Sequence, residues 1–173
     1  MVSVVLGSAL EVSAAVSREY QLKAVSLLNL VRFVQWPEPA FDSTNAPLVI
    51  GVLGRDVFGP LLDDVVQGEE VHDRRIVIER YASVHDITHC HLLFVSASEQ
   101  RAMAPILAHL NNRPILTVSD AERFTRYGGI VKLFTKPDGK IGLRINARAG
   151  KAANLKMSAM LLQVAEIVNA EDD

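Results

Sequence analysis

The spacing of apolar residues predicts a helix near each end of the chain. Between residues 18 and 35, apolar side chains recur every three to four positions, as one buried helix face requires, and Ser17 stands where an N-cap belongs. Trp36-Pro37-Glu38-Pro39 must end this helix, because proline lacks a backbone N–H and favours extended geometry in the residue before it. The same spacing returns from about Ala152 to Asn169, which predicts a last helix with Met160 in the core.

Short apolar runs in the middle of the chain predict buried strands. These runs are residues 48–53, 75–80, 91–95 and 114–118. Helices are predicted to follow the first, third and fourth runs, over residues 58–66, 99–110 and 121–127. Strands that alternate with helices in this way predict a mostly parallel sheet that is covered on both faces.

The pattern changes after Gly128-Gly129, a pair typical of a helix C-cap followed by entry into a strand. Residues 130–135 and 140–146 read as strands, and Lys136-Pro137-Asp138-Gly139 between them is a turn sequence. These two strands are therefore predicted to form an antiparallel hairpin. The predicted fold class is three-layer α/β: a mostly parallel twisted sheet of about five to six strands, a C-terminal antiparallel hairpin, and helices on both faces.

Length and charge narrow the class of protein. The chain has 173 residues, which fits one domain, placed here at residues 17–170. Its formal net charge is -2, and no cluster of Lys and Arg is interleaved with aromatic residues, so we expect no nucleic-acid partner.

Residues 1–16 carry two of the three parts of a secretory signal. Val2 to Leu10 is a short apolar stretch, and Ser13-Ala14-Ala15 offers the small residues of a cleavage site. No Lys or Arg precedes Arg18, so the basic part is missing. Two interpretations stay open: a signal peptide with an incomplete beginning, or a disordered or helical N-terminal extension.

Polar residues follow three of the predicted strands. In open α/β sheets, ligands bind outside the carboxyl ends of the strands, so these residues could line one crevice for a small molecule or anion. They are Gly54, Asp56, Ser96, Ser119 and Asp120. The two serines also have the spacing of capping boxes, with a glutamate three positions later, and capping is the competing interpretation.

Signals for catalysis are weak. The chain lacks G-x-x-x-x-G-K-[ST], G-x-G-x-x-G and G-x-S-x-G, and its acidic residues form no evident acid–base pair. The one cysteine, Cys90, cannot form a disulfide within the chain, and its apolar surroundings predict an unreactive thiol. His85, His89 and His91 lie close to it in the sequence, but strand alternation separates the side chains, so no metal is predicted. We predict a binding protein without a cofactor rather than an enzyme.

Seven short segments, in order along the chain, resemble the YfiR family of periplasmic regulators, and the resemblance covers about residues 20–168. They are Phe33-Val34-Gln35-Trp36-Pro37, Gly51 to Gly59, Cys90 to Ser96, Ile115 to Asp120, Phe124 to Ile130, Leu143 to Asn146 and Ala152 to Ser158.

The resemblance implies a location and a partner. A protein similar to this family is secreted to the periplasm, forms homodimers, and binds the periplasmic domain of a membrane-bound, YfiN-like diguanylate cyclase. It holds the cyclase inactive, which lowers cyclic di-GMP and biofilm formation. Members of the family are also associated with disulfides that respond to periplasmic redox state, and a chain with only Cys90 departs from that pattern: it has either no disulfide or one between two chains. A small-molecule or anion sensor is the alternative function.

Overall fold

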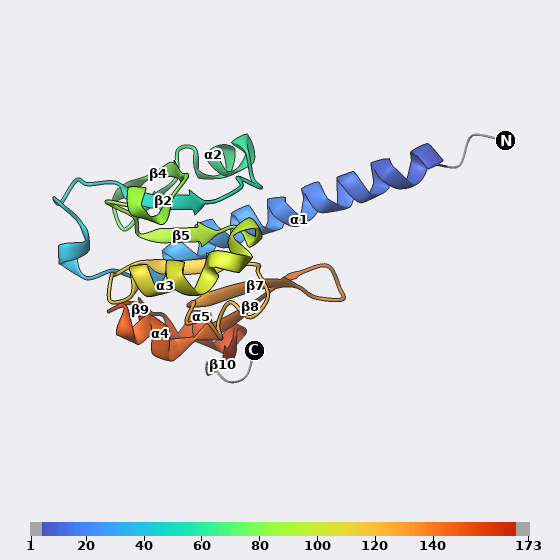
Figure 1. The fold of residues 1–173 in the computed structure, drawn as a ribbon. Coiled ribbons are helices and arrows are strands. Elements are labelled where there is room, and N and C mark those ends of the chain that lie inside the picture. The colour runs from blue at the N-terminus through green and yellow to red at the C-terminus, as the bar shows by residue number, and fades with distance from the viewer. Residues whose placement is uncertain (1–4, 169–173) are drawn as a thin grey trace.

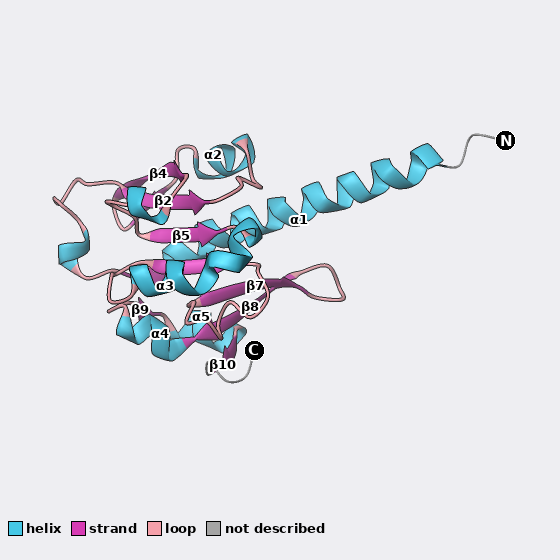
Figure 2. Cartoon of the chain, viewed as in Figure 1, coloured by secondary structure: helices cyan, strands magenta, loops and turns pink. Residues whose placement is uncertain are grey.

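A mostly parallel sheet of eight strands forms the body of the protein (Figures 1 and 2). A computed structural model describes residues 5–168, and the side chains from Val16 onward except that of Ser17. The strands of the sheet are β2 (Leu48–Leu53), β3 (Glu70–Val71), β4 (Arg74–Tyr81), β5 (Leu92–Val95), β6 (Leu116–Ser119), β7 (Val131–Thr135), β8 (Ile141–Asn146) and β10 (Glu166–Val168). Their order across the sheet is β10-β8-β7-β6-β5-β2-β4-β3.

Helices cover both faces of this sheet, as the alternating pattern predicts. The α-helices are α1 (Val5–Phe33), α2 (Pro60–Val66), α3 (Met103–Leu110), α4 (Ala147–Ala152) and α5 (Ala159–Val164). The 3₁₀ helices are η1 (Glu38–Ala40), η2 (Val84–Asp86) and η3 (Ala97–Ala102). Buried residues of α1, α2 and α5 form one apolar cluster with the sheet, and those of α3 form a second cluster on the opposite face.

The register of the sheet confirms the predicted fold class. Strand β2 is parallel to both of its neighbours, β4 and β5, so that Ile50 lies opposite Ile78 on one side and Leu92 on the other. Strands β7 and β8 form the predicted antiparallel hairpin, with Leu133 opposite Leu143. The sheet is wider than expected because two short strands, β3 and β10, extend its ends, and β10 runs parallel to β8 beyond the hairpin.

Helix α1 is longer than predicted. It begins at Val5 rather than at residue 18, so the prediction that Ser17 is its N-cap is wrong. No proline lies between Val5 and Ser17, and Ala, Leu and Glu in this stretch favour helix, so nothing stops the helix there. Figure 1 shows the N-terminal part of α1 projecting beyond the sheet. The predicted secretory segment 1–16 lies partly outside the described residues, and its interpretation stays a prediction.

Two other helix predictions are corrected by the structure. Residues 121–127 form turns instead of a helix, because Arg123 takes a left-handed backbone conformation (φ 57°) that interrupts helical geometry. The predicted helix over 99–110 is divided: its first part is the 3₁₀ helix η3, and α3 begins only at Met103.

The predicted last helix, Ala152 to Asn169, is also wrong within the described residues. Its place is taken by the end of α4, strand β9 (Lys156–Met157), α5 and β10. Asn154 is left-handed (φ 61°), which ends α4, and the Ser158 side chain accepts a hydrogen bond from the Leu161 N–H, which starts a new helix. Strand β9 pairs with β1 (Val34–Gln35) at the end of α1, and Met160 is 66% exposed rather than buried.

Candidate functional site

The predicted crevice residues lie at the carboxyl ends of three neighbouring parallel strands. Gly54 and Asp56 follow β2, Ser96 follows β5, and Ser119 and Asp120 lie at the end of β6. The structure thus brings their backbone positions to one edge of the sheet. Their side chains are held by contacts within the protein.

Asp56 is part of an ion-pair cluster. Its carboxylate accepts hydrogen bonds from the backbone N–H groups of Phe58 (2.9 Å) and Gly59 (3.0 Å) and from Arg80 Nε (2.6 Å). Arg80 also contacts Asp63 of α2 at 2.6 Å. Partial burial raises the pKa of Asp56, but the hydrogen bonds from Arg80 and the two N–H groups outweigh it and leave that pKa lowered. The cluster fastens the start of α2 to β4.

The two predicted serines are buried and serve the backbone. Ser96 is the N-cap of η3 and accepts a hydrogen bond from the Ser98 N–H. Ser119 Oγ donates to the Val95 carbonyl at 2.6 Å and accepts from the Ala121 N–H at 3.0 Å. Gly54 has a left-handed backbone (φ 86°), and an added Cβ would meet the Ser98 and Glu99 side chains. The hydrogen bonds of Ser96 and Ser119 therefore have a structural role.

Asp120 is paired with a residue that the sequence analysis did not single out. Lys23 on α1 is 4% exposed, and its Nζ lies 2.7 Å from Asp120 and 2.6 Å from Glu19. Tyr20 donates a hydrogen bond to the same Asp120 carboxylate. Burial lowers the pKa of Lys23, but the hydrogen bonds to Asp120 and Glu19 outweigh it and leave the pKa raised. The sequence does contain a signal for this ion pair: Lys23 lies on the apolar face of the helix predicted over residues 18–35.

The side chains at this edge are engaged within the protein, and a hollow remains beside one of them. A shallow hollow of about 380 Å³ lies beside Asp120 and is lined also by Gln100 and Tyr127. The crevice for a small molecule or anion therefore stays a prediction, which thermal-shift measurements with nucleotides, amino acids and inorganic anions would test.

The histidines that lie near Cys90 in the sequence have separate surroundings in the structure. His89 is exposed, His85 lies against His109 with ring centroids 4.7 Å apart, and His91 is buried. Among residues 5–168, no group of three or more His, Cys, Asp and Glu side chains is arranged to hold a metal ion.

Buried Cys90 is expected to be chemically inert in the folded protein. Its Sγ donates a hydrogen bond to the Leu92 carbonyl at 3.1 Å, and burial raises the pKa of the thiol to about 12. Because the thiolate is the reactive form, we expect no labelling by a thiol reagent at neutral pH until the protein is unfolded in urea. Rapid labelling of the folded protein, at the rate of free cysteine, would contradict this.

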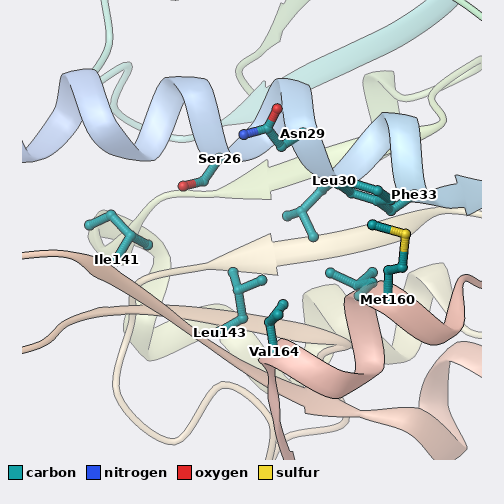
Figure 3. A pocket seen from close by; sticks show the side chains of 9 residues that line it. Ser26, Asn29, Leu30, Phe33, Ile141, Leu143, Met160 and Val164 are labelled. Carbon is teal, nitrogen blue, oxygen red and sulfur yellow. The ribbon is translucent and has the colours of Figure 1, made fainter.

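An apolar groove lies between α1, β8 and α5 (Figure 3). Its volume is about 260 Å³, and side chains from α1 face those of β8 and α5 across it. The lining residues carry no charge: Ser26, Asn29, Leu30, Phe33, Ile141, Leu143, Met160, Leu161 and Val164. The sequence analysis missed this groove because it placed Met160 in the core of a continuous helix.

Most of the large exposed apolar side chains lie on helices that border the groove or on the strand that pairs with β8. Six of the seven large exposed apolar residues in the described part of the chain belong to α1, α5 and β10: Val16, Leu22, Val25, Met160, Val164 and Ile167. Val164 is 70% and Ile167 52% exposed. An uncharged, mainly apolar groove with exposed apolar side chains in its lining is typical of a protein-interaction site. We call the groove and its exposed neighbours Met160, Val164, Leu22 and Val25 the α1/α5 surface.

Comparison with known proteins places the chain in a family. The fold defines the class: a small α/β domain whose polar side chains at the strand ends are held by internal hydrogen bonds. The family model described as YfiR/HmsC-like matches residues 20–166, and the chain belongs to that family. No curated protein matches the chain. The family is regulatory rather than catalytic, and its theme is signalling through cyclic di-GMP. None of the helices between residues 5 and 168 has the length and apolar character needed to cross a membrane.

Proposed function

We propose that this protein is a periplasmic repressor that binds the periplasmic sensor domain of an inner-membrane diguanylate cyclase. Binding holds the cyclase inactive and so lowers cyclic di-GMP and biofilm formation. The observation that carries the proposal is the family match over residues 20–166, which runs from the second half of α1 to the first residue of β10. The apolar residues 2–10 and the small residues 13–15 support secretion as a signal peptide.

A repressor of this kind works by differential affinity. A cyclase that exists in active and inactive conformations is shifted only by a protein that binds the inactive one more tightly. Such a regulator needs an interface, usually about 1,200–2,000 Å² in total, and needs no catalytic group.

The α1/α5 surface is our candidate for the contact with the sensor domain. Its groove is free of charge and offers a concave apolar centre, and Met160 and Val164 stand exposed at its rim. Charge-depleted apolar centres are where most of the binding energy of an interface resides. We also propose that the protein is a homodimer, and sedimentation equilibrium of the purified chain measures that separately.

Glutamate at Met160 or Val164 is expected to weaken binding to the sensor domain at least about 30-fold, because it places a charge against the apolar groove that the partner would cover. The measurement is biolayer interferometry with the purified periplasmic domain of the membrane cyclase encoded nearest to this gene. Cyclic di-GMP in cells that carry each variant should rise to the level of a deletion strain.

Tyr127→Glu is the matched control. Tyr127 is also a large exposed apolar side chain, but it belongs to the turns that follow β6 and does not line the groove. The control should bind like the unaltered protein. Equal binding by all variants would remove the α1/α5 surface from the proposal, and unchanged cyclic di-GMP on deletion would remove the repressor function itself.

A further inference from the structure

The strand β4 presents an open edge at the far end of the sheet from the α1/α5 surface. Strand β2 pairs with one side of β4 from Ile76 to Tyr81. On its other side, β3 covers only Arg74 and Arg75. Within residues 5–168, no strand pairs with the outer side of β4 beyond Arg75.

The outward backbone groups of this edge can be assigned from the register. The Tyr81 carbonyl accepts a hydrogen bond from the Gly54 N–H and so points toward β2. Because successive residues of a strand point their N–H and C=O groups to alternate sides, those of Ile76 and Ile78 point away from the sheet. An edge of this kind is a template for one more strand.

A groove runs along this edge, between β4 and helix α2. Its volume is about 580 Å³. Val66, Ile76 and Ile78, which pack in the core or against it, form its apolar floor. A groove bordered by a helix on one side and an open strand on the other has room for an extended peptide.

The rim of the groove is acidic. Asp63, Asp64, Glu69 and Glu70 line it, against the single basic residue Arg75. Asp63 is paired with Arg80, and Glu69 with Arg32. Asp64 and Glu70 make no ion pair with any residue that the structure describes. Their charges are available to a partner.

We propose that the groove between α2 and β4 binds an extended segment of a partner protein that alternates apolar and basic residues. The segment adds a strand to β4, its backbone pairs with Ile76 and Ile78, and its apolar side chains lie on the floor formed by Val66 and the two isoleucines. Its Lys or Arg side chains alternate with these and point to the opposite face of the added strand, where Glu70 lies opposite Arg75, while Asp64 adds to the negative charge of the rim. This site is distinct from the α1/α5 surface, at the other end of the strand order, and stands or falls independently of the repressor function.

Charge and backbone chemistry argue against other occupants. A second copy of this chain would bring the same four carboxylates against the rim, and like charges across an interface are costly. A helix would leave the outward N–H and C=O groups of β4 without strand partners, since its own backbone groups are already bonded.

The test uses a blocked synthetic peptide of about eight residues that alternates valine and lysine, labelled for fluorescence polarisation with the full chain. We expect binding that weakens with salt, with NMR shift changes for the amides of Ile76 and Ile78. N-methylation of the alternate residues that face β4 should weaken binding about tenfold or more, and methylation of the other set should not. The same peptide with glutamate for lysine should not bind.

Variants of the protein locate the site. Asp64→Lys with Glu70→Lys should weaken binding of the lysine peptide about tenfold or more, since both charges on the rim are reversed. Asp138→Lys, on the exposed turn between β7 and β8, is the control and should leave binding unchanged. No binding, equal binding of the glutamate peptide, or no effect of N-methylation would overturn the proposal, as would self-association of the chain through β4.

Discussion

Replacing Lys23 with methionine is expected to lower the free energy of unfolding by about 3–5 kcal/mol. Lys23 Nζ sits within 2.7 Å of Asp120 and 2.6 Å of Glu19, and the side chain of Asp120 is only 11% exposed. Methionine preserves most of the volume but removes the charge, which leaves the Asp120 carboxylate buried beside Tyr20 without its cation. Urea unfolding followed by circular dichroism at neutral pH measures the loss.

The control for this variant is an ion pair of the same type at the surface. Lys140 lies 3.1 Å from Asp138, but its side chain is exposed, so Lys140→Met should cost less than about 0.5 kcal/mol. Adding Asp120→Asn to Lys23→Met should recover part of the stability, because it removes the unpaired charge. A loss below about 1 kcal/mol for Lys23→Met would show that Asp120 does not depend on Lys23.

Acid is expected to destabilise the protein through His91. Burial lowers the pKa of His91 to about 4, with Arg74 and His89 adding to the effect, while the hydrogen bond to the Ala40 carbonyl and the charge of Asp42 oppose it. The neutral ring suits its surroundings: Nδ1 accepts a hydrogen bond from the Val49 N–H at 3.0 Å, and Nε2 lies 3.0 Å from the Ala40 oxygen.

The direction of the pH effect follows from proton binding. Between the ordinary histidine pKa of 6.5 and the folded value of about 4, the unfolded chain holds a proton that the folded protein does not. Stability is therefore full above pH 6.5 and falls as the pH drops toward 4, by up to about 1.4 kcal/mol per pH unit and about 3 kcal/mol in all.

Urea unfolding at about pH 7.5 and about pH 5 measures this slope, and His91→Gln supplies the comparison. Glutamine can donate and accept hydrogen bonds but does not titrate, so the variant should lose less stability on acidification than the unaltered protein. Equal losses in the two proteins would assign the acid sensitivity to other groups.

The parts of the fold that the sequence predicts are those set by local pattern. The apolar run at residues 48–53 forms β2 with the predicted bounds, and the turn sequence at 136–139 joins the predicted hairpin. The last helix fails because its apolar spacing looks helical, while tertiary contacts decide otherwise. Met157 pairs with Val34, and Ile167 pairs with Ile145, both across long stretches of chain that periodicity within one segment does not see.

The candidate sites show the same division. The sequence alone places Asp56, Ser96 and Asp120 at one edge of the sheet, because parallel strands bring their carboxyl ends to the same edge. Which groups hold these side chains depends on residues far away: Lys23 reaches Asp120 from 97 positions earlier in the chain. The α1/α5 surface could not be foreseen either, since it arises where the chain breaks its helix at Asn154 and leaves Met160 outside the core.

The pairing of Val34 with Met157 joins the exit of α1 to a segment 123 positions later in the chain (157 − 34). A chain that leaves the ribosome N-terminus first therefore releases α1 long before β8 and β9 exist to cover its apolar side. Non-local contacts of this kind slow folding, and the apolar surface that they cover stays exposed until they form. The domain therefore cannot complete its structure until β9 has been made, and α1 must stay unpaired at its exit until then.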